Sequence, residues 1–512
     1  MVTVKPDSKI KEDDISSSPK AQEVAKAQAQ NVNVDWTPED ERRAKTRFDY
    51  MVLPLLMLGF FSQQIDRGNI GPALTSGMLD DININQTIVA NGQTIMYIMV
   101  VICELPSNLL LQRVGAKFWI PCQMIVWGIV AALHSEIRNQ AGYYFCRAAL
   151  GISEAGFIPG SIYYMSTFYT KKDFASRASF FWVGSYIGKA CGGLFAAGLF
   201  RLDGQRGLHG WQWLFLVEGV VSICIGIFAL VWWPRSTADS RTLIPGFRLL
   251  TRRQEHILTT RLLLDDPAKK NAQRVRIRPR DVLDAVSAWR LWVLFLFVLS
   301  LVASVACLET YNSQIVKQLG FNTIRANALS SVGVWGSLPL ILTAGRVVAV
   351  TRQHDLSALV FTMPYPILTG VFRTLQSADG INIWTRYGAY QSMVAVGAAP
   401  YVLGVVWITS NARTPTQRSV FSALYVMLTN AANSFATQIF REGDKPKYLT
   451  GLITVLSLQS LACLLLMVAC VVFWYANKHE LGDAGLPAVT ASVEVDESKG
   501  QVIVEKKFQY AL

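Results

Sequence analysis

The sequence predicts an all-α polytopic membrane protein with twelve transmembrane helices in two six-helix bundles. The first observation is composition, because 51% of the 512 residues are hydrophobic and only 16% are charged. Soluble proteins carry about 25% charged residues. The second observation is a series of apolar runs of about 20 residues, the length that crosses a bilayer as a helix. The third is their spacing, since two groups of six runs flank one long polar stretch.

Twelve segments are apolar enough to cross a membrane. In chain order they occupy residues 48–68, 88–110, 117–135, 141–168, 176–200, 211–233, 289–315, 326–349, 356–374, 388–409, 416–438 and 449–475. The ninth is interrupted by Pro364 and Pro366. Membrane helices tolerate proline where neighbouring helices satisfy the freed backbone groups.

The two groups of six predict two packed bundles around a central cavity. The expected parts are a disordered N-terminal tail (1–46), an N-terminal bundle (47–233), a linker (234–288), a C-terminal bundle (289–475) and a C-terminal tail (476–512). The first tail is polar and lacks the apolar core of a signal peptide. Within the linker, Thr251–Asp266 is expected to form an amphipathic helix along the membrane surface, since its leucines and isoleucine share one side.

Basic residues predict the orientation, because cytoplasmic loops are rich in Lys and Arg. Residues 234–290 hold thirteen of them against six acids, whereas the first loop carries Asp80 and Asp81 and no basic residue. The linker and both tails are therefore expected to be cytoplasmic. The net charge of +12 is then a topological signal and excludes nucleic acid as a partner. The external Asn85-Gln86-Thr87 sequon is a candidate glycosylation site at Asn85.

The sequence gives little support to metalloproteins, ATP-driven pumps or enzymes. The eight cysteines fall inside apolar segments without zinc-type spacing, and the five histidines are scattered at loops and helix ends. The chain has no GxxxxGK[ST] loop, so ATP hydrolysis is not its expected energy source. We therefore expect no metal, no cofactor and no enzymatic activity. The expected setting is the plasma membrane, with the protein as a monomer.

Charged residues at membrane depth are costly and mark function by default. Asp66 and Arg67 lie late in the first segment, with Asp66 about 23 Å from Met51 along a helix. Arg147 and Glu154 lie seven residues apart in the fourth segment and share one helix face. Two alternatives stay open: the first pair could lie outside the membrane at a helix end, and the second could be a purely structural ion pair.

Further polar residues lie in other apolar segments. Lys189 is near the centre of the fifth segment, beside a stripe of glycines at every fourth position (Gly184, Gly188 and Gly192) that predicts close helix packing. Lys189 could bind a substrate anion or pair with an acid. Glu309 in the seventh segment and Asn430 and Asn433 in the eleventh are secondary candidates, which could line the cavity or only join helices.

These residue types suit a proton-coupled anion carrier. An Arg guanidinium stays charged and grips a carboxylate with two parallel hydrogen bonds. A carboxyl group in a partly dry cavity can bind and release a proton near neutral pH. One cavity with fixed cations and titratable acids could therefore bind an organic anion and a proton together.

At these residues the chain resembles the major facilitator superfamily and, within it, the anion:cation symporters, on the branch of fungal allantoate, nicotinate and pantothenate permeases. The resemblance covers roughly 45–480 and rests on five motifs: Asp66-Arg67-Gly68-Asn69; Glu104-Leu-Pro106-Ser107-Asn108; Arg147-xxx-Gly151-xx-Glu154-Ala-Gly156-xx-Pro159-Gly160; Gly210-Trp211-Gln212-Trp213-Leu-Phe215-Leu-Val-Glu218-Gly219; and Asp444-Lys-Pro446-Lys-Tyr448-Leu-Thr-Gly451. Lys189 and the loop 112–117, which lacks the usual leading acid, depart from the family pattern.

The resemblance implies uptake of a small organic carboxylate by alternating access, driven by the proton gradient. Asp66 and Glu154 carry protons in this scheme, and Arg67 and Arg147 hold the anion. We add Lys189 and Asn433 to the expected substrate site. Two other functions stay open: an exporter of an acidic metabolite, and a nutrient sensor that binds without transport.

Overall fold

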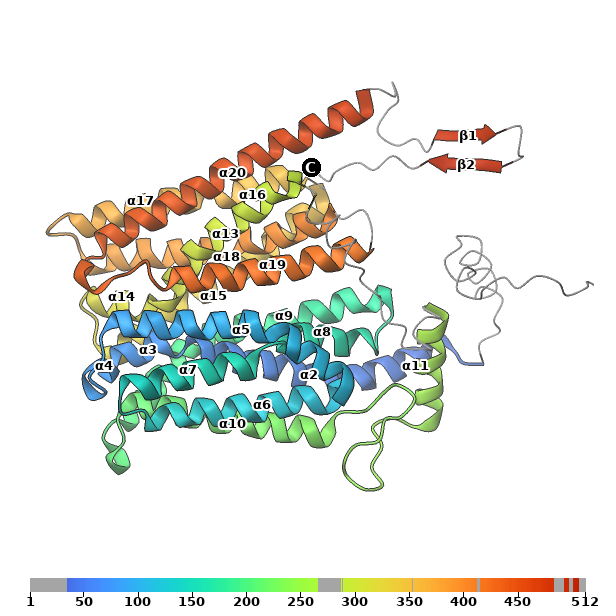
Figure 1. The fold of residues 1–512 in the computed structure, drawn as a ribbon, viewed down its shortest axis with the longest axis horizontal. Coiled ribbons are helices and arrows are strands. Elements are labelled where there is room, and N and C mark those ends of the chain that lie inside the picture. Colours follow the sequence, from blue (N-terminus) through green and yellow to red (C-terminus); the bar gives the residue numbers. More distant parts are fainter. Residues whose placement is uncertain are drawn as a thin grey trace, which may run out of the picture.

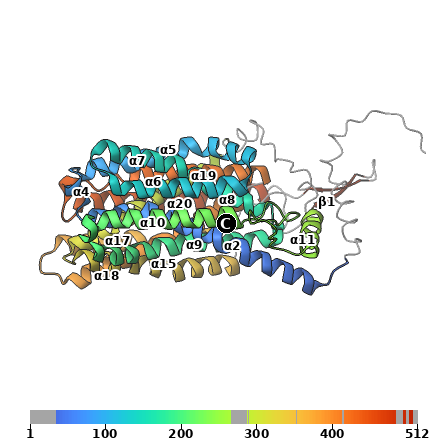
Figure 2. The ribbon, with the colours of Figure 1, turned by 90° about the horizontal axis from the view of Figure 1, so that it is seen from below.

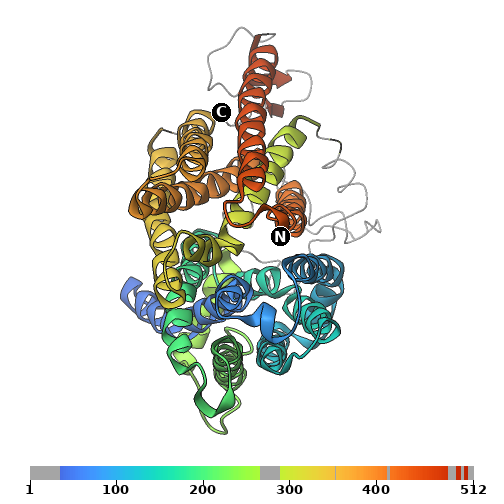
Figure 3. The ribbon, with the colours of Figure 1, turned by 90° about the vertical axis from the view of Figure 1, so that its left-hand side faces the viewer.

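The computed structural model describes residues 35–265, 287, 289–351, 353–411, 415–482, 492–496 and 501–505. Long helices run side by side, with the N-terminal half below and the C-terminal half above in Figure 1. Seen from one end, the halves form two groups of helices (Figure 3). The predicted all-α membrane fold is confirmed. Outside it, β1 (Ser492–Asp496) and β2 (Gln501–Glu505) form an antiparallel hairpin in the C-terminal tail that the sequence pattern did not predict.

The helices follow the predicted order. The N-terminal half contains α2 (Pro38–Gly68), α3 (Ile70–Thr75), α4 (Met78–Asp81), α5 (Gln86–Val114), α6 (Ala116–Leu133), α7 (Gln140–Glu154), α8 (Phe157–Ser166), α9 (Lys171–Leu199) and α10 (Gly210–Trp232). After α11 (Arg252–Asp265), the C-terminal half contains α13 (Trp289–Thr310), α14 (Asn312–Gln318), α15 (Thr323–Thr351), α16 (His354–Thr362), α17 (Pro364–Ser377), α18 (Ile383–Ser410), α19 (Pro415–Ala436) and α20 (Leu449–Gly482).

Nine helical stretches in the described part of the chain are long and apolar enough to span a membrane, and they match nine of the twelve predicted segments. The other three predicted segments are also helical, as α2, α7 with α8, and α19. The fourth segment is broken into helices of 15 and 10 residues, each too short to span a membrane alone. The first and eleventh carry the polar residues Asp66, Arg67, Asn430 and Asn433. The N-terminal end of α2 and the C-terminal end of α20 lie at the same end of the bundle (Figure 1).

The first helix begins ten residues earlier than predicted. Pro38 occupies its first turn, and the Thr37 hydroxyl accepts a hydrogen bond from the Asp40 backbone N–H at 3.2 Å, while the Asp40 carboxylate accepts one from the Thr37 N–H. This capping box satisfies backbone donors that a helix start leaves open. Residues 38–46, predicted as part of a disordered tail, are therefore helical, whereas residues 1–34 lie outside the described part.

The fourth predicted segment is broken directly after Glu154. Gly156 has a φ of +82°, and a Cβ there would lie 2.6 Å from the Ser107 hydroxyl, so both the backbone angle and the space require glycine. The break frees a backbone carbonyl at Ala155, which accepts a hydrogen bond from Gln123 Nε2 at 2.7 Å. The fold thus holds the end of α7, and with it Glu154, by side chains from α5 and α6.

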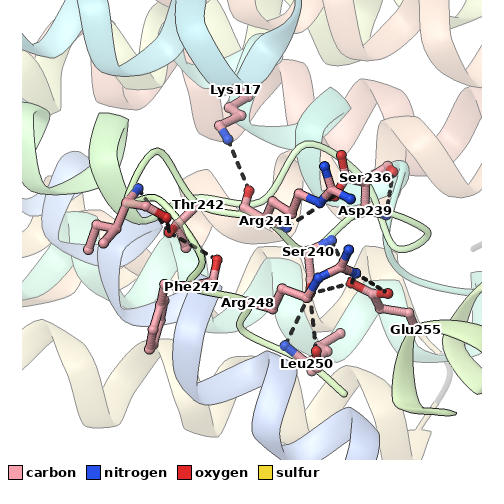
Figure 4. A network of polar contacts seen from close by, with 11 residues as sticks. Lys117, Ser236, Asp239, Ser240, Arg241, Thr242, Phe247, Arg248, Leu250 and Glu255 are labelled. Atoms are coloured by element: carbon pink, nitrogen blue, oxygen red, sulfur yellow. Dashed lines mark hydrogen bonds and ion pairs between the residues drawn. The ribbon is translucent and has the colours of Figure 1, made fainter. Parts of the chain in front are cut away.

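The linker is anchored to the N-terminal half by the polar network of Figure 4. Glu255 Oε1 accepts hydrogen bonds from the Ser240 backbone N–H and hydroxyl at 2.9 and 2.6 Å, and Arg248 donates to Oε2 at 3.1 Å. From the first turn of α6, Lys117 Nζ donates to the Arg241 carbonyl at 3.2 Å. The linker therefore closes over the end of this half.

Helix α11 confirms the predicted linker helix but not its environment. It runs across the end of the bundle (Figure 2), and its apolar residues Ile257, Leu258 and Leu262 are buried against the protein rather than facing lipid. Arg261 pairs with Glu41 on α2 at 2.6 Å and with Asp173 on α9. Burial opposes the charge of Asp173, but the hydrogen bond and charge of Arg261 outweigh it and lower the pKa of that carboxyl.

Candidate functional site

A cavity of about 230 Å³ lies between the two halves. Helices α2, α3, α5, α8 and α9 line it from one half, and α13, α14, α15, α18 and α19 from the other. Among the described residues that line it, the three with charged side chains are Arg67, Lys189 and Glu309. Asn430 and Asn433 also line it, which is the first of the two positions left open for them. The predicted central cavity is present and is polar at several points.

Arg67 connects the cavity to a buried carboxylate. Its Nε donates a hydrogen bond to Glu154 Oε2, in an ion pair whose arginine side chain is 12% exposed and whose glutamate side chain is fully buried. Glu154 therefore lies behind Arg67 as seen from the cavity. The α7 break holds this carboxylate at the C-terminal end of its helix, where the helix dipole does not favour a negative charge. Arg67 thus stabilises a charge that the helix alone would not.

Asp66 points away from the cavity although it is next to Arg67 in sequence. Successive helix residues are rotated by about 100°, and Asp66 faces α10, where Ser222 donates a hydrogen bond to Oδ2 at 2.9 Å. Its second carboxylate oxygen is buried without a hydrogen-bond partner. Asp66 and Arg67 are both enclosed by the bundle, close to the C-terminal end of α2, rather than exposed at its surface.

Arg147 is enclosed within the N-terminal half and does not line the cavity. Its guanidinium lies over the rings of Tyr143 and Phe215, at 5.4 and 5.9 Å from their centroids. Such contacts stabilise a cation where water is excluded. Its Nη1 donates a weak hydrogen bond to the Met96 sulfur at 3.9 Å. Arg147 is near enough to Asp66 to interact with it electrostatically.

Lys189 and Glu309 form an ion pair across the cavity. Lys189 Nζ donates to Glu309 Oε2 at 2.8 Å, and the two side chains are 33% and 30% exposed. Lys189 comes from α9 in one half and Glu309 from the end of α13 in the other. Of the two roles left open for Lys189, pairing with an acid is therefore present in this conformation, and the acid is the secondary candidate Glu309.

The predicted glycine stripe on α9 is confirmed at two of its three positions. A Cβ at Gly184 or Gly188 would lie 2.6 Å from a backbone oxygen of α2, so glycine is required for this contact. Gly192 has nothing within 4 Å of that position, whereas a Cβ at Gly193 would lie 2.4 Å from the Asn327 carbonyl oxygen in the other half. Gly193, the residue that follows Gly192, therefore allows α9 to approach α15 closely.

Hydrogen bonds join the halves at the end of the cavity near the loop between α4 and α5. Gln86 Nε2 donates to the Phe440 carbonyl at 3.0 Å, and Asn327 Nδ2 donates to the Thr75 hydroxyl at 2.7 Å. A Cβ at Gly71 would lie 2.5 Å from the Thr310 carbonyl oxygen, so α3 packs directly on the end of α13. The cavity is thus closed on the side predicted to be external.

Some residues of the site were not predicted from the sequence. The cavity is also lined by Gln64, Tyr97, Tyr186, Asn312 and Tyr401. Gln64 shares a helix face with Arg67 and Gly68 at spacings of three and four, a signal that could have identified it. The tyrosines resemble ordinary aromatic helix residues in the sequence. No cluster of three or more potential metal-ligating side chains occurs in the part of the chain that is described.

Comparisons with known proteins agree with this architecture. Residues 56–437 match the family model described as Major Facilitator Superfamily. An uncharacterized transporter of Saccharomyces cerevisiae is 26% identical over 470 residues, which cover 90% of this chain and 85% of that protein. A candidate tartrate transporter of Agrobacterium vitis is 28% identical over 309 residues, covering 60% of this chain and 66% of that protein.

The fold is shared with solved transporters. The crystal structure of a D-xylose-proton symporter superposes with a TM-score of 0.61 at 14% identity, covering 81% of this chain and 97% of that one. The family match extends over more than half of the chain, and it coincides with a cavity between two helical halves. The chain therefore belongs to the Major Facilitator Superfamily and is a multi-pass membrane transporter, not an enzyme.

Proposed function

We propose that this transporter is a symporter that takes up a small organic carboxylate together with protons, by alternating access. The observation that carries the proposal is the cavity itself, where Arg67 and Lys189 present positive charge from two helices. Carboxylate recognition needs fixed cations of this kind. The candidate tartrate transporter among the relatives is named for such a substrate.

Protons would be carried by Asp66 and Glu154, which lie behind the cavity wall. Glu154 accepts a hydrogen bond from Arg67. Protonation of Glu154 would therefore remove the negative charge that pairs with this cation of the cavity wall. Arg147 is not exposed to substrate in this conformation, and we assign it an electrostatic role beside Asp66 and Glu154. Asn433 and Asn430 would bind the polar groups of the substrate from the other half.

The energy source in this scheme is the proton gradient, with no cofactor. We place the protein in the plasma membrane as a monomer with its linker in the cytoplasm. Efflux of an acidic metabolite would use the same residues in the opposite direction. Counterflow measurements and an imposed gradient of either sign therefore decide the direction.

Uptake into proteoliposomes tests the proposal. A panel of labelled mono- and dicarboxylates, including tartrate and nicotinate, is supplied with and without an inward proton gradient. We expect at least one acid to accumulate only with the gradient, and Glu154→Gln to abolish that accumulation. Glu136→Gln is the matched control, because Glu136 is 67% exposed at a helix end. Uptake indifferent to the gradient, or unimpaired in Glu154→Gln, would overturn the mechanism.

A further inference from the structure

We propose that Glu309 is the proton-coupling residue of the C-terminal half, and that the substrate carboxylate competes with it for Lys189. The inference deepens the proposed function and rests on it. It starts from the ion pair between Lys189 and Glu309, which joins the two halves at 2.8 Å inside the cavity.

The first step concerns which cation a substrate can reach. Both cations of the cavity wall already have a carboxylate partner, Arg67 with Glu154 and Lys189 with Glu309. An incoming carboxylate that takes the place of a protein carboxylate does so at one of these two cations. Glu154 is fully buried behind Arg67, so its displacement has no path through the cavity. Glu309 is 30% exposed to the cavity, so the exchange is open at Lys189.

The second step concerns the charge left on Glu309 after displacement. The titratable side chains that interact with it electrostatically are Lys189 and Tyr186 on α9, Tyr97 on α5, Tyr365 on α17, and Tyr390 and Tyr401 on α18. Helix α19 presents the uncharged Asn430 and Asn433, and α3 presents apolar residues and Gly71 to the same cavity. Lys189 is thus the one cation in this set.

The third step is the proton. Exchange at Lys189 leaves the Glu309 charge without its cation and close to the substrate carboxylate, and both changes favour the protonated carboxyl group. Protonation of Glu309 removes that charge. In the balanced exchange, the substrate carboxylate bonds to the Lys189 ammonium, the Glu309 carboxylate leaves it, and one proton from water binds to Glu309. When the substrate departs, Glu309 loses this proton and pairs with Lys189 again. One proton then moves with each substrate carboxylate.

The experiment compares Glu309→Gln with wild type in two assays. Binding of the labelled carboxylate panel is measured between pH 5.5 and pH 7.5, and uptake is measured in proteoliposomes as counterflow and as gradient-driven accumulation. In wild type, binding that takes up one proton strengthens up to about tenfold for each unit of pH decrease. In Glu309→Gln, the number of protons taken up with binding should fall by one, and binding at pH 7.5 should tighten. In the uptake assays, counterflow should persist while gradient-driven accumulation falls.

Further variants keep the test decisive. Glu309→Asp retains the carboxyl group and should retain the pH dependence, which guards against a simple folding defect of the glutamine variant. Lys189→Met should lose binding, and Lys189→Arg should keep it. An unchanged pH dependence or a loss of binding in Glu309→Gln, with wild-type behaviour of Glu309→Asp, would overturn this inference alone. Wild-type protein that shows no proton-driven uptake of any acid would overturn the proposed function as well.

Discussion

Replacing Arg67 by methionine should destabilise the protein through the carboxylate it leaves behind. Glu154 is fully buried and its bonded cation is the 12% exposed Arg67. Breaking a buried ion pair by removing one partner costs about 3–5 kcal/mol, because the remaining charge is uncompensated. Glu154 Oε1 is already buried without a hydrogen-bond partner, and the second cation near Glu154, Arg147, interacts with it electrostatically without a hydrogen bond. We expect the cost of Arg67→Met to lie within this range.

Adding Glu154→Gln to Arg67→Met removes the orphaned charge, so the double variant should be more stable than the sum of the single effects predicts. Interaction energies between contacting residues reach about 0.5–3 kcal/mol in such cycles, and we expect a value near 3 kcal/mol here. The measurement is reversible unfolding in detergent micelles, with the four proteins at one pH.

The pair Arg138 and Glu136 is the matched control. These side chains are 87% and 67% exposed and 3.9 Å apart, and exposed pairs contribute at most about 1 kcal/mol. The same cycle there should be additive. Additivity within about 0.5 kcal/mol at Arg67 and Glu154 would refute the reasoning, because it would mean that the two charges do not depend on each other.

Three further predictions concern other parts of the molecule. Gly193→Ala places a Cβ 2.4 Å from the Asn327 oxygen, so the halves should separate at their closed end. Thr94 on α5 donates a hydrogen bond to the Ser434 carbonyl of the other half at 3.1 Å, and an impermeant maleimide should therefore label a Thr94→Cys probe faster. Gly192→Ala is the control, and equal labelling in both would contradict the prediction. Glu255→Ala leaves the donors of the linker network unpaired and should lower the unfolding free energy by about 1–3 kcal/mol and speed proteolysis of the linker, whereas alanine at the exposed Glu39 should do neither. Asn85 is exposed at the start of α5, so a glycosidase should reduce the apparent mass of the native protein; Asn85→Gln and Thr87→Ala should both remove this shift, and a shift that survives either change would exclude Asn85 as the acceptor.

The membrane fold could be predicted from local patterns. Apolar runs of bilayer length identify the helices wherever the runs are uniform, as at 211–233. The pattern locates the ends and breaks of helices less accurately, since the capped start at Pro38 and the turn at Gly156 depend on single residues. The charged residues inside apolar segments also indicated a transporter rather than an enzyme, because charges at membrane depth are costly and by default mark substrate or ion pathways.

Residue type and position within the apolar segments could select the candidate residues, but could not show which of them form ion pairs. Arg67 and Glu154 lie 87 positions apart and Lys189 and Glu309 lie 120 apart, distances over which no periodicity carries information. Neighbouring residues were equally ambiguous, since Asp66 contacts α10 whereas Arg67 lines the cavity. Arg147 is of a residue type that commonly binds carboxylates, yet the packing of Tyr143 and Phe215 encloses it. The one-dimensional pattern thus establishes which charges enter the membrane, because burial in lipid is a property of each segment. Which charges face the cavity and which neutralise one another depends on how helices from both halves pack, because ion pairing requires contact in space.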